Sequence, residues 1–284
     1  MDEPGDDRRR AVAAAAEDMG YEVMPFKGTR ENVLRHVPRT VPLTVTASPQ
    51  KGLSATVKLA AELAGAGYRV APHLSARLTR DKAELQDFLG ILSAAGISSL
   101  FVVGGDGDDC GAYKTAHELL VDIHESGFVF GDIGIAGYPE GHPLIGEPDL
   151  TRALSDKAPL AHHITTQMCF DIKRIRSWAA ALPERGVHLP VRIGIPGAVS
   201  RQKLMRIAGA IGLGDSARFL RKQQQLLWRF FLPGGYNPGK IVRSVAADIG
   251  RSPNIAGFHV FTFNDLGGTE RWRQSLLRRA PATP

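Results

Sequence analysis

The sequence predicts a single (β/α)8 TIM barrel, and three observations support this fold class. Eight short apolar runs with strand-like composition recur along the 284 residues, amphipathic segments with helical spacing lie between most of them, and turns rich in glycine or proline separate the two kinds of segment. Alternating strands and helices favour parallel pairing through right-handed crossovers. Eight strands in a chain of this length fit a closed barrel better than an open doubly wound sheet.

The first four predicted strands are apolar runs next to a breaker residue. Tyr21–Met24 ends before a proline, Leu43–Thr46 begins after one, Arg69–His73 follows Gly67, and Ser99–Gly104 ends in glycine. Each of the last three precedes or follows a segment with helical periodicity. The amphipathic segments in this half of the chain are Leu53–Gly65, Lys82–Ala95 and Tyr113–Ser126.

The second half continues the alternation and then becomes less regular. Its predicted strands, rich in Ile, Val, Thr and Phe, are Ile133–Ala136, His163–Gln167, Val191–Ile195 and Gly257–Phe263. Its predicted helices are Asp171–Leu182, Arg201–Ile211, about Asp215–Phe231 and about Pro238–Ile249. The break Leu232-Pro233-Gly234-Gly235 separates the last two helices, which we interpret as additional helices before the last strand and not as a second domain.

These elements predict one domain over residues 1–284. Residues 1–19 form an N-terminal extension whose Ala-rich part predicts an extra helix, residues 20–265 form the barrel, and residues 266–284 form a C-terminal helix and tail. The chain has no apolar run of the ~18 residues that a membrane helix needs and no signal-peptide core, and it has only two cysteines. We therefore expect a cytoplasmic protein with no membrane partner.

Positive charge is concentrated in the stretch Arg201–Arg243, which carries nine basic residues and one acid, Asp215. Such a patch attracts a phosphorylated cofactor, an acidic substrate tail or nucleic acid, and a solvated helix face explains it equally well. No signature of a nucleic-acid-binding module accompanies the patch, so we expect no nucleic-acid partner. Self-association into a homo-oligomer is left open.

Two segments place polar residues where a barrel enzyme carries its chemistry, at or beyond the C-terminal ends of strands. The segment Gly134–Pro143 breaks at Tyr138-Pro139 and presents Tyr138 and His142 on the following loop. The first strand places Glu22 opposite in direction to Val23, so Glu22 faces the barrel axis if Val23 faces the helices. A carboxyl group there is either a general acid or the partner of a surface arginine.

Other strand ends are less specific when taken singly. Asp106 follows two glycines in a turn whose spacing fits neither a dinucleotide fingerprint nor a phosphate-binding loop, and we expect no metal there. Gln167 carries a donor and an acceptor that suit the edge of a heterocycle, although a loop-bracing role is equally common. His73 ends a strand, where a histidine is often simply hydrogen-bonded in place.

Taken together, these segments resemble the methylenetetrahydrofolate reductase family over about residues 20–265, in collinear order. The matching pieces are Tyr-Glu-Val-Met-Pro at Glu22, Val-Thr-Ala at Thr46, Ala-Pro-His-Leu at His73, Gly-Gly-Asp at Asp106, Gly-Tyr-Pro-Glu-Gly-His-Pro from Gly137, Thr166-Gln167 with Phe170-Asp171, and the final strand Phe258–Asn264. The resemblance implies a (β/α)8 barrel that reduces 5,10-methylenetetrahydrofolate to 5-methyltetrahydrofolate, a reaction of one-carbon metabolism.

The resemblance also implies roles for individual residues. Glu22 and Asp106 match the catalytic carboxyls: Glu22 matches the acid that assists opening of the five-membered ring, and Asp106 matches a carboxylate near the pterin. The substrate-binding positions are Gln167, which matches a pterin-binding amide, and Phe219, which matches a stacking aromatic in a loose alignment. Arg218 is added from the basic stretch Arg201–Arg243, which we expect to hold the acidic tail of the folate. The positions that contact the flavin in familiar members are Thr46, His73, Tyr138 and His142.

Departures from the family pattern concern the flavin. Flavin-using members have an arginine before the Gly-Asp, where this chain has Gly104, and basic residues where it has Ser155 and Asp156. Each lost charge-assisted contact to a diphosphate removes about 1.5–3 kcal/mol. We therefore expect a member in which FAD is absent and NADH is the cosubstrate. The alternatives are an FAD-dependent reductase, folate-linked methyl transfer on a related barrel, and a non-catalytic folate-binding protein of the same fold.

Overall fold

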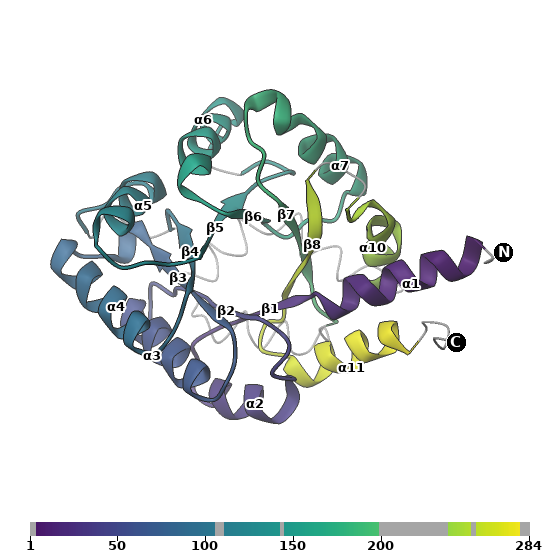
Figure 1. Ribbon diagram of the computed structural model, residues 1–284, viewed down its shortest axis with the longest axis horizontal. Helices are drawn as coiled ribbons and strands as arrows, with labels where there is room; N and C mark the ends of the chain where they lie inside the picture. Colours follow the sequence, from purple (N-terminus) through teal and green to yellow (C-terminus); the bar gives the residue numbers. More distant parts are fainter. Residues whose placement is uncertain (1–3, 106–110, 143–144, 199–237, 251–253, 279–284) are drawn as a thin grey trace.

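The computed structural model describes residues 4–105, 111–142, 145–198, 238–250 and 254–278. Strands β1 to β8 pair in parallel in sequence order, and β8 pairs with β1, so the sheet closes into a barrel surrounded by helices (Figure 1). This confirms the predicted (β/α)8 fold. The strands are β1 Gly20–Val23, β2 Leu43–Val45, β3 Val70–Ser75, β4 Ser99–Val103, β5 Asp132–Gly137, β6 His163–Thr166, β7 Val191–Pro196 and β8 Ile255–Phe261.

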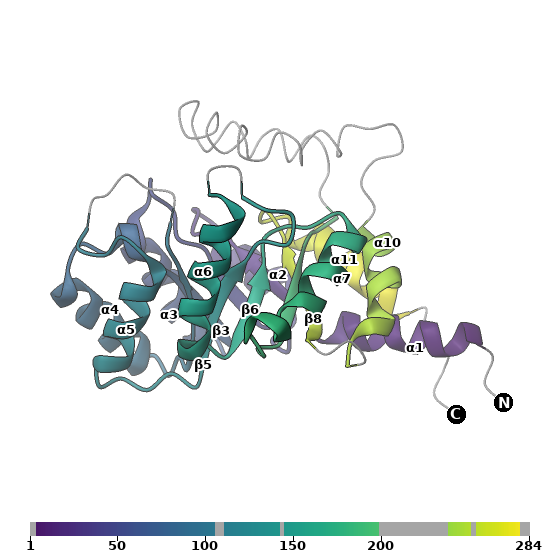
Figure 2. The same cartoon turned by 90° about the horizontal axis from the view of Figure 1, so that it is seen from above.

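The described helices cover the outside of the barrel (Figures 1 and 2). Their bounds are α1 Pro4–Glu17, α2 Thr29–His36, α3 Gly52–Gly65, α4 Lys82–Ala94, α5 Ala116–Glu125, α6 Glu147–Lys157, α7 Ile172–Ala181, α10 Pro238–Val245 and α11 Leu266–Leu277. Short 3-10 turns follow β3, α6, α7 and α10. In the described part of the chain, no helix is both long and apolar enough to cross a membrane.

Alternation along each strand decides which side chains enter the barrel. On β1, Tyr21 and Val23 are fully buried among the core residues that pack between sheet and helices, and Glu22 between them faces inward. On β8, Phe258 and Val260 are buried in the same core, which turns His259 inward beside Glu22. The apolar alternation seen in the sequence thus fixes the polar interior as well as the core.

Several element boundaries differ from the sequence-based expectations. The last strand ends at Phe261 and not at Phe263, because Phe263 and Asn264 adopt left-handed backbone angles (φ 49° and 55°) that no strand permits. Helix α5 begins at Ala116, three residues later than expected, since Thr115 caps it by accepting a hydrogen bond from the N–H of Glu118. The predicted helices Arg201–Ile211 and about Asp215–Phe231 lie outside the described residues.

The first and last described helices join the two ends of the chain. Helices α1 and α11 pack against each other beside the β1–β8 seam (Figure 1). Arg273 of α11 donates from Nε to the carbonyl of Ala16 (2.7 Å) and from Nη1 to Oε1 of Glu270 (3.0 Å). The Tyr21 hydroxyl donates to Oε2 of the same Glu270 (2.7 Å), so β1, α1 and α11 share one buried polar cluster. Burial, with Glu270 beside it, raises the pKa of Tyr21.

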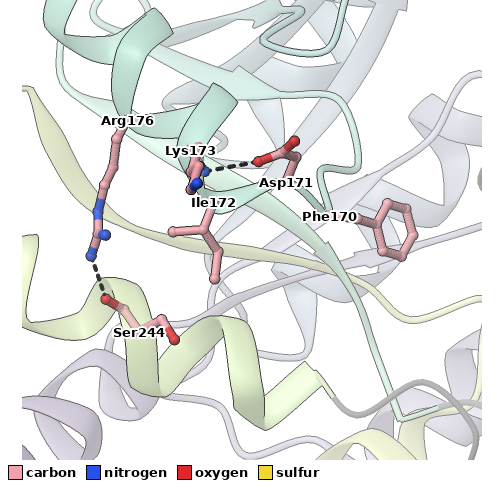
Figure 3. A pocket seen from close by; sticks show the side chains of 6 residues that line it. All are labelled: Phe170, Asp171, Ile172, Lys173, Arg176 and Ser244. Atoms are coloured by element: carbon pink, nitrogen blue, oxygen red, sulfur yellow. Dashed lines mark hydrogen bonds between the residues drawn. The ribbon is translucent and has the colours of Figure 1, made fainter.

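A shallow cavity of about 450 Å³ lies on the outer face between α7 and α10 (Figure 3). The guanidinium of Arg176 is already engaged, since it donates to Asp248 (2.7 Å) and to the carbonyl of Ser244 (2.7 Å). Asp171 caps α7 by accepting from the N–H groups of Lys173 and Arg174. These contacts tie α10 to the barrel, and the cavity has no lining residue in common with the cluster around Glu22.

Candidate active site

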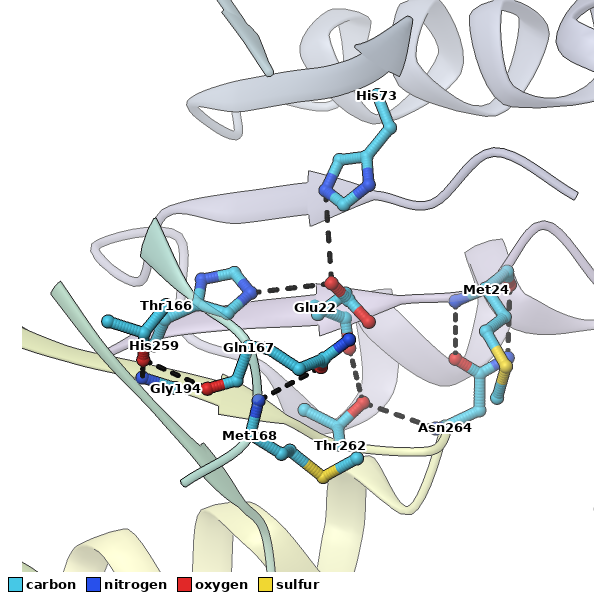
Figure 4. Close-up of polar contacts among 10 residues, drawn as sticks. All are labelled: Glu22, Met24, His73, Thr166, Gln167, Met168, Gly194, His259, Thr262 and Asn264. Atoms are coloured by element: carbon cyan, nitrogen blue, oxygen red, sulfur yellow. Dashed lines mark hydrogen bonds and ion pairs between the residues drawn. The ribbon is translucent and has the colours of Figure 1, made fainter. Parts of the chain in front are cut away.

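Glu22 lies inside the barrel with two histidines against one of its oxygens (Figure 4). Its Oε2 is 3.5 Å from Nε2 of His259 on β8 and 3.8 Å from Nε2 of His73 on β3. The Glu22 side chain is 15% exposed, and the two imidazoles are 6% and 11% exposed. In the described part of the chain no lysine or arginine pairs with Glu22. The expectation that Glu22 faces the barrel axis is therefore confirmed, and the surface-arginine interpretation is not.

His73 is a neutral imidazole at neutral pH. Burial, only partly offset by the nearby Glu22, lowers the pKa of His73 from 6.5 to about 4. Its ring packs against Phe101, with centroids 4.6 Å apart. Its Nε2 has no hydrogen-bond partner among the described residues, and neither has Oγ1 of Thr44, which is the neighbour of Glu22 on β2. The interior beside Glu22 therefore holds polar atoms that a bound molecule can satisfy.

The backbone at Glu22 is held by the turn that follows β8. The hydroxyl of Thr262 donates to the carbonyl of Glu22. Asn264 accepts from the N–H of Met24 (2.9 Å) and donates to its carbonyl (3.0 Å) and to Oγ1 of Thr29 (2.9 Å). The left-handed conformation of Asn264 suits this role, because asparagine tolerates that backbone region better than most residues.

Gln167 follows β6 directly, and the register of the sheet fixes its backbone. Its N–H donates to the carbonyl of Gly137 at the end of β5 (2.8 Å), and its side-chain Oε1 accepts from the N–H of Met168 (2.9 Å). Figure 4 shows Gln167 on the side of the barrel interior that also holds Glu22 and His259. The amide oxygen thus braces the backbone of the next residue, as the loop-bracing interpretation expected. The amide NH2 group makes no hydrogen bond to a described residue.

The loop after β5 brings Tyr138 and His142 together. Their rings meet edge to face, with centroids 5.2 Å apart and an interplanar angle of 86°. Between them, Oε1 of Glu140 accepts from the N–H groups of Phe170 (2.6 Å) and Asp171 (2.7 Å). Glu140 therefore fastens the loop after β5, which carries Tyr138, to the segment after β6, which begins with Gln167.

The ends of β2 and β4 lie at the same rim of the barrel, because the carboxyl ends of parallel strands share one edge. Thr46 donates its N–H to the carbonyl of Val23 (2.9 Å). A Cβ at Gly104 would meet no atom of the described residues within 4 Å. A Cβ at Gly105 would lie 2.1 Å from Oγ of Ser75, and its φ of +89° also requires glycine.

Of the other residues named from the sequence, some lie in the described part of the chain and some do not. Asp106, Arg218 and Phe219 lie outside the described residues. Ser155 is half-buried and Asp156 exposed in the last turn of α6. Among the described residues, no three His, Cys, Asp or Glu side chains form a group that could hold a metal ion.

Three residues that position the site escaped the sequence analysis, namely His259, Thr262 and Asn264. All three come from the last strand or the turn after it, about 240 positions from Glu22. Alternation on β8 was a usable signal for His259, because Phe258 and Val260 are apolar and the residue between them must face the barrel interior. No local signal links Thr262 or Asn264 to the first strand.

Comparison with known proteins gives a family match over more than half of the chain. The family model described as methylenetetrahydrofolate reductase matches residues 28–214. Among solved structures, the chain is similar to a candidate deoxyribose-phosphate aldolase from Toxoplasma gondii, with 13% identity, a TM-score of 0.48, and 98% of this chain and 99% of that chain covered. It is also similar to dihydropteroate synthase from Thermus thermophilus, with 12% identity, a TM-score of 0.45, and 91% and 90% covered. Similarities this low say nothing about the reaction.

Proposed function

Because this chain belongs to the methylenetetrahydrofolate reductase family, we propose that it reduces 5,10-methylenetetrahydrofolate to 5-methyltetrahydrofolate with hydride taken directly from NADH and without bound flavin. Family membership makes the protein an oxidoreductase that acts on a folate. The observation that carries the assignment of the site is Glu22, an inward carboxyl in a barrel interior with no described cation beside it.

Glu22 supplies the proton in this scheme. It protonates the substrate nitrogen as the C–N bond of the five-membered ring breaks, which leaves an iminium cation. Hydride from NADH then adds to the iminium carbon and gives the methyl group, so one proton and one hydride are consumed and NAD+ leaves. Direct transfer requires the donor and acceptor carbons to approach to roughly 3–3.5 Å, so both substrates must be bound at once.

Residues on the rim are assigned to the two substrates. Gln167 binds the pterin edge, and its described contacts leave the amide NH2 group available for that role. Asp106 stabilises positive charge near the pterin, and Phe219 and Arg218 contact the rest of the folate. Thr46, His73, Tyr138 and His142 line the nicotinamide. Since no arginine can be assigned to a 2′-phosphate, NADH is preferred over NADPH.

Two features support the absence of flavin. Gly104 stands where flavin-using members carry an arginine, although a Cβ there would meet none of the described atoms within 4 Å. Asp156 is an exposed acid at a position where those members carry a base, and a like charge opposes a diphosphate. The loss of these cations weakens flavin binding and leaves the space of its ring system to the nicotinamide.

The test is NADH oxidation at 340 nm by protein stripped of flavin, with 5,10-methylenetetrahydrofolate present. We expect turnover that added FAD does not increase, and initial-rate patterns that show a sequential mechanism. Activity only with FAD, or a ping-pong pattern, would replace this proposal by the FAD-dependent reductase. No turnover under either condition would favour methyl transfer or a non-catalytic folate-binding protein.

A further inference from the structure

We propose that Thr166 is a positioning residue whose hydroxyl group fixes the direction in which Gln167 presents its amide to the folate. This inference rests on the proposed function, in which Gln167 binds the pterin edge. Thr166 is the last residue of β6 and is only 1% exposed, so it acts on the substrate through its neighbour and not by contact.

The hydroxyl group of Thr166 joins the turn that carries Gln167 to the next strand. Its Oγ1 accepts from the N–H of Gly194 on β7 (2.8 Å) and donates to the carbonyl of Gln167 (2.9 Å), as Figure 4 shows. A hydroxyl group can donate and accept at once, and here it does both with backbone groups. The carbonyl of Gln167 is therefore held at a fixed place relative to β7.

Gly194 allows the turn to approach β7 this closely. A Cβ at this position would collide with the carbonyl oxygen of Thr166 and lie 3.0 Å from that of Gln167. The carbonyl of Gly194 accepts from the N–H of Cys169 (2.9 Å), and the N–H of Gln167 donates to the carbonyl of Gly137 on β5 (2.8 Å). The turn is thus bonded to both of the strands that flank β6.

A backbone fixed in this way decides which atoms of the Gln167 amide face the ligand. Its Oε1 accepts from the N–H of Met168 (2.9 Å), and since a backbone N–H can only donate, the amide oxygen must take this contact. The NH2 group makes no hydrogen bond to a described residue. Gln167 therefore offers hydrogen-bond donors, and its ligand has to bring an acceptor, such as the carbonyl oxygen or an unprotonated ring nitrogen of a pterin.

Cys169 contacts the same carbonyl but does not replace Thr166. Its Sγ donates to the carbonyl of Gln167 (2.9 Å), and burial raises the pKa of Cys169, so the thiol keeps its proton. A thiol is a weaker donor than a hydroxyl group. Among the described residues, it is Thr166 whose side chain joins this carbonyl to the N–H of Gly194. Loss of the Thr166 hydroxyl should therefore loosen the turn even with the thiol in place.

The binding test compares Thr166→Val, which removes the hydroxyl group and keeps the shape, with Thr166→Ser, which keeps the hydroxyl group. Ser126→Ala is the matched control. The hydroxyl group of Ser126 also donates to a carbonyl, that of Ile123 (2.6 Å), and accepts from an N–H, that of Phe128 (3.2 Å). It lies in the connection from α5 to β5, at the opposite end of the strands from Gln167.

The affinity for 5-methyltetrahydrofolate, the proposed product, is measured by calorimetry without NADH. Thr166→Val should raise the Kd by about 3- to 10-fold, the factor for loss of one ordinary hydrogen bond. Thr166→Ser and Ser126→Ala should stay within about twofold of wild type. In a Gln167→Ala background, Thr166→Val should change the Kd by less than about twofold, because no amide remains to be positioned.

Two results of the binding test would overturn the inference. One is a wild-type Kd in Thr166→Val when Gln167→Ala weakens binding. The other is an equal effect of Thr166→Val with and without Gln167, because a hydroxyl group that only stabilises the fold would show that behaviour. Should Thr166→Val fail to fold, Thr166→Ala takes its place in each comparison.

A second measurement needs no ligand. In protein labelled with 15N at glutamine, the side-chain NH2 signals of Gln167 are identified by their loss in Gln167→Ala. They should shift in Thr166→Val and keep their positions in Thr166→Ser. Unmoved signals in Thr166→Val would refute the inference whatever the protein binds. Shifted signals together with a wild-type folate Kd in Gln167→Ala would refute the assignment of Gln167 in the proposed function, and with it the effect of Thr166 on affinity.

Discussion

Glu22 combines a carboxyl group, a half-buried position and two neighbouring imidazoles, and its replacement by glutamine tests the chemistry with little change in shape. We expect Glu22→Gln to lower kcat by about 100-fold or more, because general acid catalysis contributes on the order of 10²–10⁴. The folate KM should change much less, because the amide fills the same space. Single-turnover NADH oxidation measures the chemical step. An active Glu22→Gln enzyme would show that another group supplies the proton.

His73 should make the stability of the folded protein depend on pH. Its pKa is about 4 in the folded state and 6.5 in the unfolded chain, so between these values only the unfolded chain binds the proton. The free energy of unfolding should therefore fall as the pH drops from about 6.5 to about 4, by up to about 3 kcal/mol from this residue. Urea denaturation at a series of pH values measures it.

The comparison with His73→Asn isolates this contribution, because the other groups that titrate in the same range are present in both proteins. The variant should lose less stability than wild type over that pH interval. The exposed His188→Asn serves as the control and should follow the wild-type curve. Parallel curves for wild type and His73→Asn would contradict the assignment of a depressed pKa to His73.

At the scale of elements, Glu140 couples the β5 loop to the start of α7. Its Oε1 accepts from two backbone N–H groups, and both would lose their partner in Glu140→Ala. We expect that variant to lose about 2–3 kcal/mol of stability, because hydrogen bonds to a charged acceptor contribute about 1.5–3 kcal/mol each when buried and these are partly exposed. The folate KM should rise severalfold as Gln167 loses its support.

Glu184→Ala is the matched control for this change, since Glu184 is an exposed glutamate on the 3-10 turn after α7. It should leave both the urea midpoint and the folate KM at their wild-type values. Equal effects of the two substitutions would mean that Glu140 does not brace the loops.

Most strands were predictable from the sequence because their signal is local: apolar runs bounded by glycine and proline. Helix α2 and the start of α5 were not, because α2 has only eight mostly polar residues and α5 starts at a cap. In the site, alternation was enough to place Glu22 inward. The partners of Glu22 were not predictable locally, because His259 lies 237 positions away and meets it only through closure of the barrel.

At the scale of the whole molecule, the cluster of Tyr21, Glu270 and Arg273 joins the N-terminal and C-terminal parts of the chain. Arg273→Met would leave the half-buried Glu270 without its cation and the carbonyl of Ala16 without its donor. Breaking a buried pair from one side costs about 3–5 kcal/mol, and we expect a loss of this size in urea denaturation. The exposed Arg271→Met on the same helix should stay within about 0.5 kcal/mol of wild type.

The β1–β8 seam also determines when folding can finish during synthesis. Strand β1 leaves the ribosome early, yet its partner β8 and the α11 side chains that bind Tyr21 are made more than 230 residues later. Until then one edge of β1 has no strand to pair with, and contacts of such large sequence separation form slowly. The nascent chain must therefore keep one edge of β1 unpaired for most of its translation. Such an edge is a surface to which chaperones can bind and from which aggregation can start.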